Sequence, residues 1–188
     1  MIQSKQDLKT FLEKDRQALG IPAQCKRPRW LWGDDIWKFQ RALRYHEYHS
    51  NVKRGGILTK IKKTYWGYRH YKLGLRLGLQ IPCNVFDYGL RINHYGLIVV
   101  NGGSRIGKFC DIHQGVNIGT SFRGGAPQLG DNCWIGPGAK LFGDITIGNE
   151  VAIGAGSIVG KSFEKDDITI VGCPARKIKD TGTIYKRK

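Results

Sequence analysis

The chain has 188 residues and a formal net charge of +16 at neutral pH, with 31 lysines and arginines against 15 acidic residues. This length suits one or two small domains that each bury a core. No apolar run approaches the roughly 20 residues that cross a membrane, and the N-terminus lacks the apolar segment of a signal peptide, so we exclude an integral membrane protein and expect a cytoplasmic one.

Positive charge gathers in residues 1–80, which hold 18 of the basic residues and 6 of the acidic ones. Residues 51–80 contain eight bases and no acid, and aromatic residues lie among them. Nucleic acid, an anionic membrane surface and a phosphate-bearing or acidic substrate would all suit this pattern. A solvated basic helix face fits it equally well. The eight bases are Lys53, Arg54, Lys60, Lys62, Lys63, Arg69, Lys72 and Arg76.

Two helices are predicted at the start of the chain. The first begins after Ser4, because Ser4 and Asp7 have the spacing of a capping box, and it ends at Gly20. The second follows Asp34 or Asp35, either of which can cap it, and ends at a pair of glycines.

A third predicted helix, from about Ile57 to Leu79, leads into a different kind of sequence. Glycines at positions 67, 74 and 78 argue against its continuity, and Pro82 stops it. After Pro82, aliphatic residues recur at a fixed interval.

From Val100 to about Gly160 the chain repeats every six residues. An aliphatic residue occupies the first position of each hexad, glycine usually the second, and a small residue the fifth. Repeats of this kind are a signature of a parallel β-helix. The first positions are Ile106, Ile112, Ile118, Leu129, Ile135, Leu141, Ile147, Ile153 and Val159.

Each hexad is expected to form a short strand with its first and fifth residues inward, followed by a corner where a permissive residue relieves backbone strain. Three hexads close a triangular coil of about 18 residues, and the coils stack about 4.8 Å apart. Cys110 and Cys133 occupy fifth positions. We therefore expect the cysteines to be reduced packing residues rather than disulfides, metal ligands or nucleophiles.

Two segments interrupt the repeat. The first coil, with Phe86, Ile92 and Ile98 inward, is out of phase with the later hexads. Residues 121–128, with the sequence SFRGGAPQ, leave a corner as a polar loop, and loops on rigid scaffolds often carry function. The tail is expected to cap the open edge. We divide the chain into a basic helical region, a β-helix domain and a basic tail, at residues 1–80, 81–171 and 172–188.

The hexads and the strings IGAGSIVGKSF and ITIVGCPARKI resemble the hexapeptide-repeat acyltransferases. The stretches INHYGLIVVN and IGKFCDIHQGVNIGT are most similar to the serine acetyltransferase branch, especially to relatives associated with capsule and lipopolysaccharide synthesis. The resemblance implies a left-handed β-helix, although parallel crossovers are usually right-handed. It also implies a homotrimer with active sites between subunits, and acetyl-CoA as the donor in direct transfer to a hydroxyl or an amine.

By this resemblance His94, in the string INHYG, is the general base that takes the proton from the attacking hydroxyl. In such enzymes an acidic residue orients the base, and Asp87 is the nearest candidate. Asp111 follows His94 by about one coil and is a second candidate. The alternative for His94 is a structural histidine of the first coil.

His113 stands where most hexads have glycine, so it either contacts the acceptor or has a structural role at a subunit interface. It follows His94 by about one coil, but the close histidine pair that binds zinc in solenoid carbonic anhydrases is missing. His46, His49 and His70 lie among aromatic residues and are expected to be packing or surface residues. We therefore expect no metal.

Coenzyme A needs a groove between coils, backbone groups for its pantetheine arm and positive charge for its phosphates. The resemblance places small residues in the groove and basic residues on the phosphates. Because hexads require small residues in any case, the basic residues are the better indicators. The predicted coenzyme contacts are Gly136, Ala139, Gly154, Ala155, Lys161, Arg176 and Lys179.

The acceptor side departs from the serine acetyltransferase pattern. Those enzymes place an aspartate directly before the catalytic histidine and an Arg-His pair in the corner loop, whereas this chain has Asn93 and, in its loop, Arg123 without a histidine. Losing the carboxylate removes a partner for the ammonium group of an amino acid. We therefore predict an acetyl-CoA-dependent O-acetyltransferase that acts on a glycan hydroxyl in polysaccharide synthesis, with Asn93, His113 and Arg123 binding the acceptor.

Two alternatives stay open. In the first, the chain is a serine O-acetyltransferase of cysteine synthesis, with Asn93 and Arg123 in a rewired amino-acid site. In the second, it is not an enzyme, and its basic helices bind nucleic acid or an anionic membrane. For the main prediction we expect peripheral contact with an anionic membrane and no nucleic acid.

Overall fold

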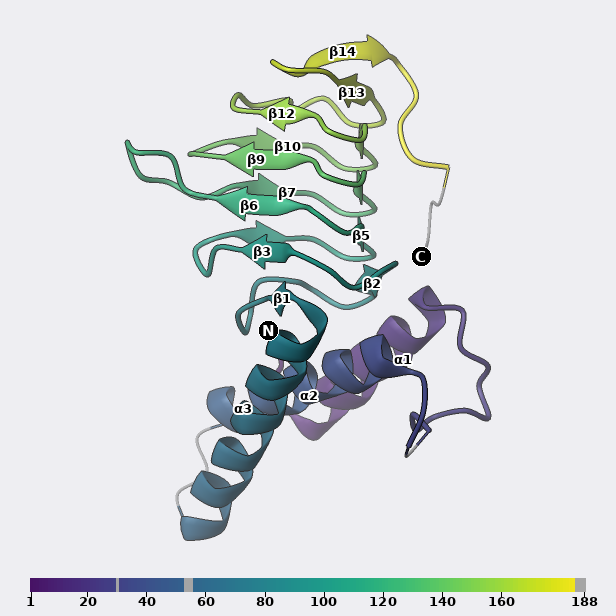
Figure 1. The fold of residues 1–188 in the computed structure, drawn as a ribbon, viewed down its shortest axis with the longest axis vertical. Helices are drawn as coiled ribbons and strands as arrows, with labels where there is room; N and C mark the ends of the chain where they lie inside the picture. The colour runs from purple at the N-terminus through teal and green to yellow at the C-terminus, as the bar shows by residue number, and fades with distance from the viewer. Residues whose placement is uncertain (30, 53–55, 185–188) are drawn as a thin grey trace.

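The computed structural model of the chain describes residues 1–29, 31–52 and 56–184. Over these residues three helices precede a column of short strands and lie at its base (Figure 1). The helices are α1 (Lys5–Ala18), α2 (Asp35–Asn51) and α3 (Ile57–Leu77). None of the helices in these ranges has the length and hydrophobicity to cross a bilayer. Lys53, Arg54 and the predicted helix end at Gly55 lie outside the described residues, as do residues 185–188 of the tail.

The strands form three sheets, which are the faces of a triangular column. The five-stranded face contains β1 (Leu79–Gln80), β3 (Ile98–Val100), β6 (Asn117–Gly119), β9 (Lys140–Phe142) and β12 (Ile158–Val159). The three-stranded face contains β4 (Arg105–Ile106), β7 (Gln128–Leu129) and β10 (Thr146–Ile147). The six-stranded face contains β2 (Arg91–Ile92), β5 (Asp111–Ile112), β8 (Trp134–Ile135), β11 (Ala152–Ile153), β13 (Thr169–Val171) and β14 (Arg176–Lys179).

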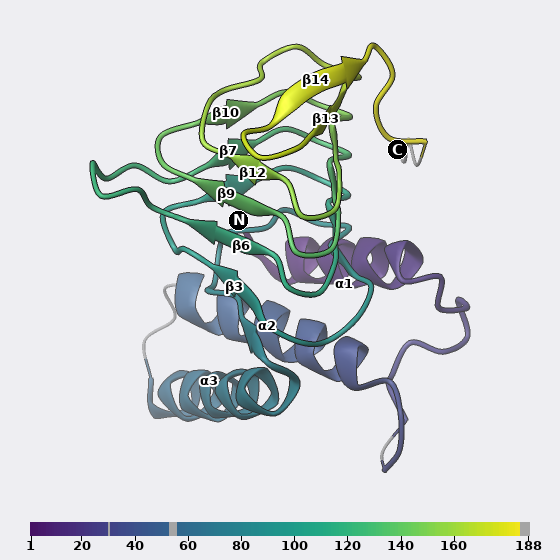
Figure 2. The same cartoon turned by 45° about the horizontal axis from the view of Figure 1, so that its top comes forward.

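Three corners recur along the column, because each coil passes from the five-stranded face to the three-stranded face, then to the six-stranded face and back. We call these passages corner I, corner II and corner III in that order. The connection between β6 and β7, residues 120–127, leaves corner I and projects from the column (Figure 2). At the far end β14 pairs antiparallel with β13, while the other neighbouring strands of the sheets are parallel.

The aliphatic first positions of the hexads form the core of the column, as predicted. On the six-stranded face Ile92, Ile112, Ile135 and Ile153 stack in register, and each is at most 1% exposed. Burying one such side chain stabilises a fold by about 1.5–3 kcal/mol. The six-residue period therefore sets both the core and the register.

The second-position glycines serve close stacking of the coils, and the permissive corner residue that we predicted is at another position of the hexad. Gly107, Gly130 and Gly136 lie outside the left-handed region of backbone space. A Cβ on Gly136 would lie 2.7 Å from the backbone nitrogen of Ala155 in the next coil, and Gly107 and Gly130 are equally close to their neighbours. Left-handed backbone occurs instead at the fourth position of the hexad, at Phe109, Gly115, Asn132, Gly138, Glu150 and Gly156.

The predicted cap of α1 is confirmed, and the predicted cap of α2 is wrong. The Ser4 hydroxyl accepts a hydrogen bond from the Asp7 N–H at 3.0 Å. Asp34 precedes α2, but its carboxylate accepts the backbone N–H of Arg29 at 2.9 Å and makes no cap. Asp35 is already the first helical residue.

The third helix runs without a break through Gly67 and Gly74 and ends at Leu77, ahead of the predicted stop at Pro82. Gly78 follows it in the left-handed conformation, which is a common way to end a helix. A Cβ on Gly74 would lie 2.6 Å from the carbonyl oxygen of Leu79. The glycines therefore let the helix approach β1 closely.

A buried ion-pair network joins α1 and α2 to the first coil. Arg44 of α2 is fully buried and contacts the carboxylates of Asp15 at 2.8 Å and Glu47 at 3.0 Å. It also donates to the carbonyl oxygens of Phe86 and Asp87 at 2.9 and 2.7 Å. Burial alone would lower the pKa of Arg44, but the two carboxylates outweigh it and raise the pKa. The helices and the coil that carries His94 are thus one packed unit.

The five cysteines are all free thiols, but only some of them pack as predicted. Cys110 and Cys133 are fully buried in the core. Burial raises the pKa of Cys133 to about 12 and that of Cys110 well above its ordinary value, so neither thiol supplies a nucleophile. Cys25 and Cys173 are exposed, which corrects our prediction for them.

Candidate functional site

His94 lies at corner III of the first coil, in the connection from β2 to β3 (Figure 1). Its side chain is exposed, and among the described residues its ring has no hydrogen-bond partner. His94 is therefore open to solvent in the single chain. Corner III is where the six-stranded face turns into the five-stranded face.

A carboxylate from the next coil contacts Asn93, the residue before His94. β2 and β5 pair in parallel, with Arg91 opposite Asp111. Asp111 is almost fully buried, accepts a close hydrogen bond from the Asn93 amide, and contacts the Arg91 guanidinium at 3.4 Å. The stacking of coils therefore fixes Asn93, the residue before His94, against a negative charge. Of the two acids predicted to orient the base, Asp111 is the one that approaches this corner.

Asp87 does not orient His94, which corrects the prediction. It follows the bridge between Phe86 and Ile106 and therefore lies at corner II, one face of the column away from His94. Its carboxylate accepts the backbone N–H of Tyr88 at 2.7 Å, and its carbonyl oxygen accepts from Arg44. Asp87 is thus part of the contact between the helices and the first coil.

His113 lies at corner III one coil beyond Asn93 and is partly buried. Its Nδ1 is 3.0 Å from the carbonyl oxygen of Ile135 and 3.9 Å from the nearer carboxylate oxygen of Asp111. Its ring packs edge-on against Trp134, with centroids 4.9 Å apart. Because a carbonyl oxygen only accepts, Nδ1 carries the proton in the neutral ring and Nε2 is left as an acceptor. The histidine in place of glycine thus extends the polar cluster of Asp111.

Several predicted coenzyme contacts share this corner. Gly136, Gly154 and Ala155 occupy corner III in the third and fourth coils, above His113, and Ala155 is exposed. Arg176 pairs with Val171 at the corner III end of β13. A row from His94 to Arg176 therefore runs along one edge of the column, and the exposed guanidinium of Arg176 is at its far end.

Ala139 cannot contact a coenzyme, which corrects the prediction. The residue is fully buried because it fills the fifth position of its hexad. Its N–H donates to the carbonyl oxygen of Gly136, and its own carbonyl oxygen accepts from Asn117. Neither its side chain nor its backbone faces a groove.

Three further basic residues lie elsewhere on the chain. Arg123 is exposed in the loop at corner I and stacks on Phe122, and Lys161 follows β12 at the same corner. Lys179 pairs with Thr169, at the end of β14 away from Arg176. Within one chain the structure does not bring these residues to His94.

Two large hollows lie on the described part of the chain. A hollow of about 530 Å³ covers the three-stranded face, and one of about 600 Å³ lies between α3 and the first coil. His94 lines neither of them. The corner where the predicted residues gather is therefore an open surface of the single chain.

Sequence reasoning missed Arg91 and Trp134, which complete the cluster around Asp111 and His113. The signal was present in the register, because Arg91, Asp111 and Trp134 occupy the same hexad position on three successive coils. The loop of residues 120–127 is inserted between β6 and β7, and it disturbs the regular sequence spacing between Asp111 and Trp134.

Comparison with known proteins identifies the repeat. Residues 126–161 match the family "Bacterial transferase hexapeptide (six repeats)". The match covers β7 to β12, and with them the hexads that begin at residues 129 to 159.

Serine acetyltransferases are similar to this chain in sequence and in fold. The chain is 40% identical over 112 residues to that of Synechococcus elongatus, covering 57% of this chain and 46% of the relative. It is 41% identical over 108 residues to that of Staphylococcus xylosus, covering 56% and 47%. The crystal structure of the Brucella abortus enzyme aligns with a TM-score of 0.69 and 26% identity, over 93% of this chain and 69% of its own.

These matches confirm the left-handed β-helix and correct one prediction. The chain spans about half the length of the curated relatives it matches. Because these relatives and structures are named as serine acetyltransferases, the predicted glycan acceptor and the role in polysaccharide synthesis are wrong, and the first alternative is favoured. The chain is a left-handed hexapeptide-repeat protein that resembles the serine acetyltransferases within the hexapeptide-repeat acyltransferases.

Proposed function

We propose that the chain is an acetyl-CoA-dependent acetyltransferase that acts on the hydroxyl of serine. The observation that carries this proposal is the exposed His94 at corner III, next to an Asn93 side chain held by Asp111, on a chain similar to serine acetyltransferases. A base on an open corner is accessible to both a thioester and a small hydroxyl acceptor.

His94 takes the proton of the serine hydroxyl while the hydroxyl oxygen attacks the thioester carbonyl carbon. A C–O bond forms, the tetrahedral oxyanion collapses, the C–S bond breaks, and the CoA thiolate takes up the proton from the imidazolium. General-base help of this kind accelerates a reaction by about 10²- to 10⁴-fold. The transfer is direct, in keeping with the protonated, buried state of Cys110 and Cys133.

Asp111 supplies a carboxylate next to Asn93, the uncharged residue that precedes the base. The serine acetyltransferase pattern has an aspartate there, and this chain has Asn93. The Asp111 carboxylate comes from the next coil and accepts a hydrogen bond from the Asn93 amide. We infer that Asn93 and Asp111 together meet the ammonium group of serine, and that Arg91 and His113 hold the carboxylate of Asp111 in place.

The active site is proposed to form between copies of the chain. Arg123 and Lys161 lie at corner I, whereas His94 and Arg176 lie at corner III. In a closed ring of three copies, each interface joins two different surfaces of the chain. These two surfaces are proposed to be corner I of one copy and corner III of the next. Arg123 then contacts the acceptor and Lys161 the coenzyme phosphates from the neighbouring copy, and the open corner gains its second wall.

The outward side of α3 is proposed to touch an anionic membrane. Its exposed apolar and aromatic side chains are interleaved with lysines and arginines that no acidic residue of this helix balances. Apolar burial and attraction to anionic lipid act together on such helices. The cytoplasmic location stays a prediction. The exposed side chains are Ile57, Leu58, Ile61, Tyr65, Tyr68, Tyr71 and Leu75, and the bases are Lys60, Lys62, Lys63, Arg69, Lys72 and Arg76.

The test is acetyl transfer by the purified chain with a set of small acceptors. CoA and acetylated product are followed by chromatography, because the exposed Cys25 and Cys173 would consume a thiol reagent. We expect CoA release that depends on L-serine and formation of O-acetylserine, with little transfer to threonine and none to glycine, which has no hydroxyl. Failure to bind CoA, together with tight and salt-dependent binding to DNA, would support the non-enzymatic alternative instead.

A further inference from the structure

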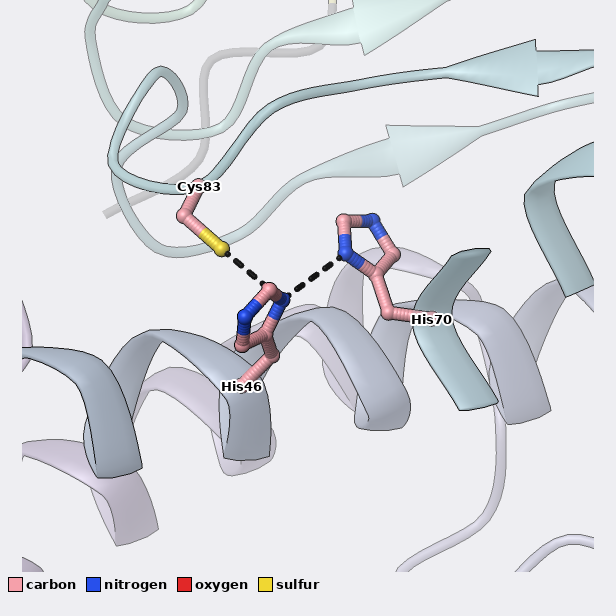
Figure 3. A group of neighbouring side chains, drawn as sticks. All are labelled: His46, His70 and Cys83. Atoms are coloured by element: carbon pink, nitrogen blue, oxygen red, sulfur yellow. Dashed lines mark hydrogen bonds between the residues drawn. The ribbon is translucent and has the colours of Figure 1, made fainter. Parts of the chain in front are cut away.

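Three side chains with metal-binding atoms meet between the helices and the first coil. His46 comes from α2, His70 from α3, and Cys83 from the segment after β1, and all three point toward one another (Figure 3). Nδ1 of His46 lies 3.2 Å from Nδ1 of His70 and 3.3 Å from the Cys83 sulfur. The three atoms all lie within 4.8 Å of one another. We had expected these histidines to be packing or surface residues.

The spacing suits a tetrahedral metal ion. With Zn–N bonds of about 2.0–2.1 Å and Zn–S bonds of about 2.3 Å, neighbouring ligand atoms lie roughly 3.3–3.7 Å apart. The two contacts of His46 are already close to this separation. Two imidazoles and a thiolate are a ligand set that selects zinc and similar borderline-soft metals over calcium or magnesium.

The surroundings provide the support that a metal site needs. The His70 ring packs against Phe39, with ring centroids 5.1 Å apart, which holds it in place beside His46. Gly67 leaves room beside the His46 ring, since a Cβ there would lie 3.2 Å from Nε2 of that ring. His46 and His70 also line the hollow of about 600 Å³ between α3 and the first coil.

We propose that His46, His70 and Cys83 bind one Zn²⁺ ion that fastens α2 and α3 to the first coil. Zn²⁺ replaces the thiol proton of Cys83, which leaves to solvent, and both Nδ1 atoms supply their lone pairs. The fourth position opens toward the hollow and takes a water molecule. The ion lies outside the row of residues at corner III and takes no part in acetyl transfer.

Cobalt(II) is the probe, because it replaces zinc and reports its ligands by absorption. The full chain is freed of metal with a chelator, and Co²⁺ is added to it. We expect one Co²⁺ per chain, the intense visible bands of a tetrahedral site, a near-ultraviolet charge-transfer band from the thiolate, and loss of these bands when Zn²⁺ is added.

Substitutions assign the ligands. Cys83→Ser should remove the charge-transfer band. Both Cys83→Ser and His70→Gln should weaken Co²⁺ binding by more than the roughly 10- to 100-fold that loss of an outer-shell partner costs. The matched controls are Cys25→Ser, which removes an exposed thiol, and His49→Gln, which lies on the same helix as His46. Both should bind as the unchanged chain does.

Two results would overturn the proposal. One is the absence of a tetrahedral spectrum in the unchanged chain, which would leave the three side chains as a hydrogen-bonded group. The other is a thiolate band that survives in Cys83→Ser and disappears in Cys25→Ser. If Cys83→Ser does not fold, the melting temperature of the unchanged chain decides, because Zn²⁺ should raise it and the chelator should reverse the rise.

Discussion

Replacing Arg44 by methionine should destabilise the junction between the helices and the column more than any surface change. The substitution keeps most of the side-chain volume but leaves the carboxylates of Asp15 and Glu47 buried without their partner. It also removes the donors to the carbonyl oxygens of Phe86 and Asp87. Breaking a buried ion pair from one side costs about 3–5 kcal/mol. An orphaned buried hydrogen-bonding group costs about 1–3 kcal/mol more, although such costs do not simply add.

The assay is equilibrium unfolding in urea, followed by circular dichroism, with the unchanged chain and Arg76→Met beside it. Arg76 is an exposed arginine whose ion pair with Asp35 spans 3.9 Å, so its loss should cost less than about 1 kcal/mol. For Arg44→Met we expect a loss of at least about 4 kcal/mol in the free energy of unfolding. A loss no larger than that of Arg76→Met would refute the reasoning that this network holds the helices to the first coil.

Three other outcomes follow from the structure. Gly136→Ala should lower the melting temperature more than Gly156→Ala. The new Cβ at position 136 would meet the Ala155 backbone, whereas Gly156 has open space around it and only a left-handed backbone. The reverse order of melting temperatures would contradict the stacking argument. Burial lowers the pKa of His70 to about 4, so below about pH 6.5 the unfolded chain takes up a proton that the folded chain excludes. The free energy of unfolding of the metal-free protein should therefore fall by up to about 3 kcal/mol between pH 6.5 and 4. The fall should be smaller in His70→Gln. Ile61→Glu should weaken cosedimentation with anionic vesicles at least tenfold, and unchanged binding would argue against membrane contact by α3.

The repeat could be predicted from the sequence because every coil follows the same short pattern of residue types. The aliphatic residue at every sixth position has no reasonable alternative to burial, so the core and the strands followed directly. The reason for the glycines did not follow, since Gly107 and Gly136 are required by the next coil and not by their own backbone. The pattern of glycines also did not indicate that Asn132 and Glu150 have a left-handed backbone.

The contacts between distant parts of the chain were beyond the sequence pattern. Asp15 and Arg44 lie 29 positions apart on two helices, and nothing local marks them as partners. His46 and His70 were interpreted as packing or surface residues because they lie among aromatic residues, and only the packing of α2 on α3 brings them together.

The candidate site was predicted in part. Resemblance indicated His94, and the fold places it exposed at corner III, next to Asn93. Asp111, which stacking had offered as one of two acids, contacts Asn93 and not His94 in the described residues. Asp87 was preferred because it is nearer in sequence, but in a triangular coil seven residues lead to a different corner. The glycan acceptor is contradicted by the similarity to serine acetyltransferases. It was predicted because Asn93 replaces the aspartate before His94, and the contact of Asn93 with Asp111 of the next coil could not be seen in the sequence.

The most direct measurement of the central claim compares serine acetylation by the unchanged chain and by His94→Ala. His94 is exposed and has no partner among the described residues, so its loss should leave the circular dichroism and melting temperature unchanged. We predict that the unchanged chain forms O-acetylserine from acetyl-CoA and that His94→Ala loses at least about 100-fold in kcat with an unaltered affinity for CoA. Turnover by His94→Ala within twofold of the unchanged chain would contradict the assignment of His94 as the base.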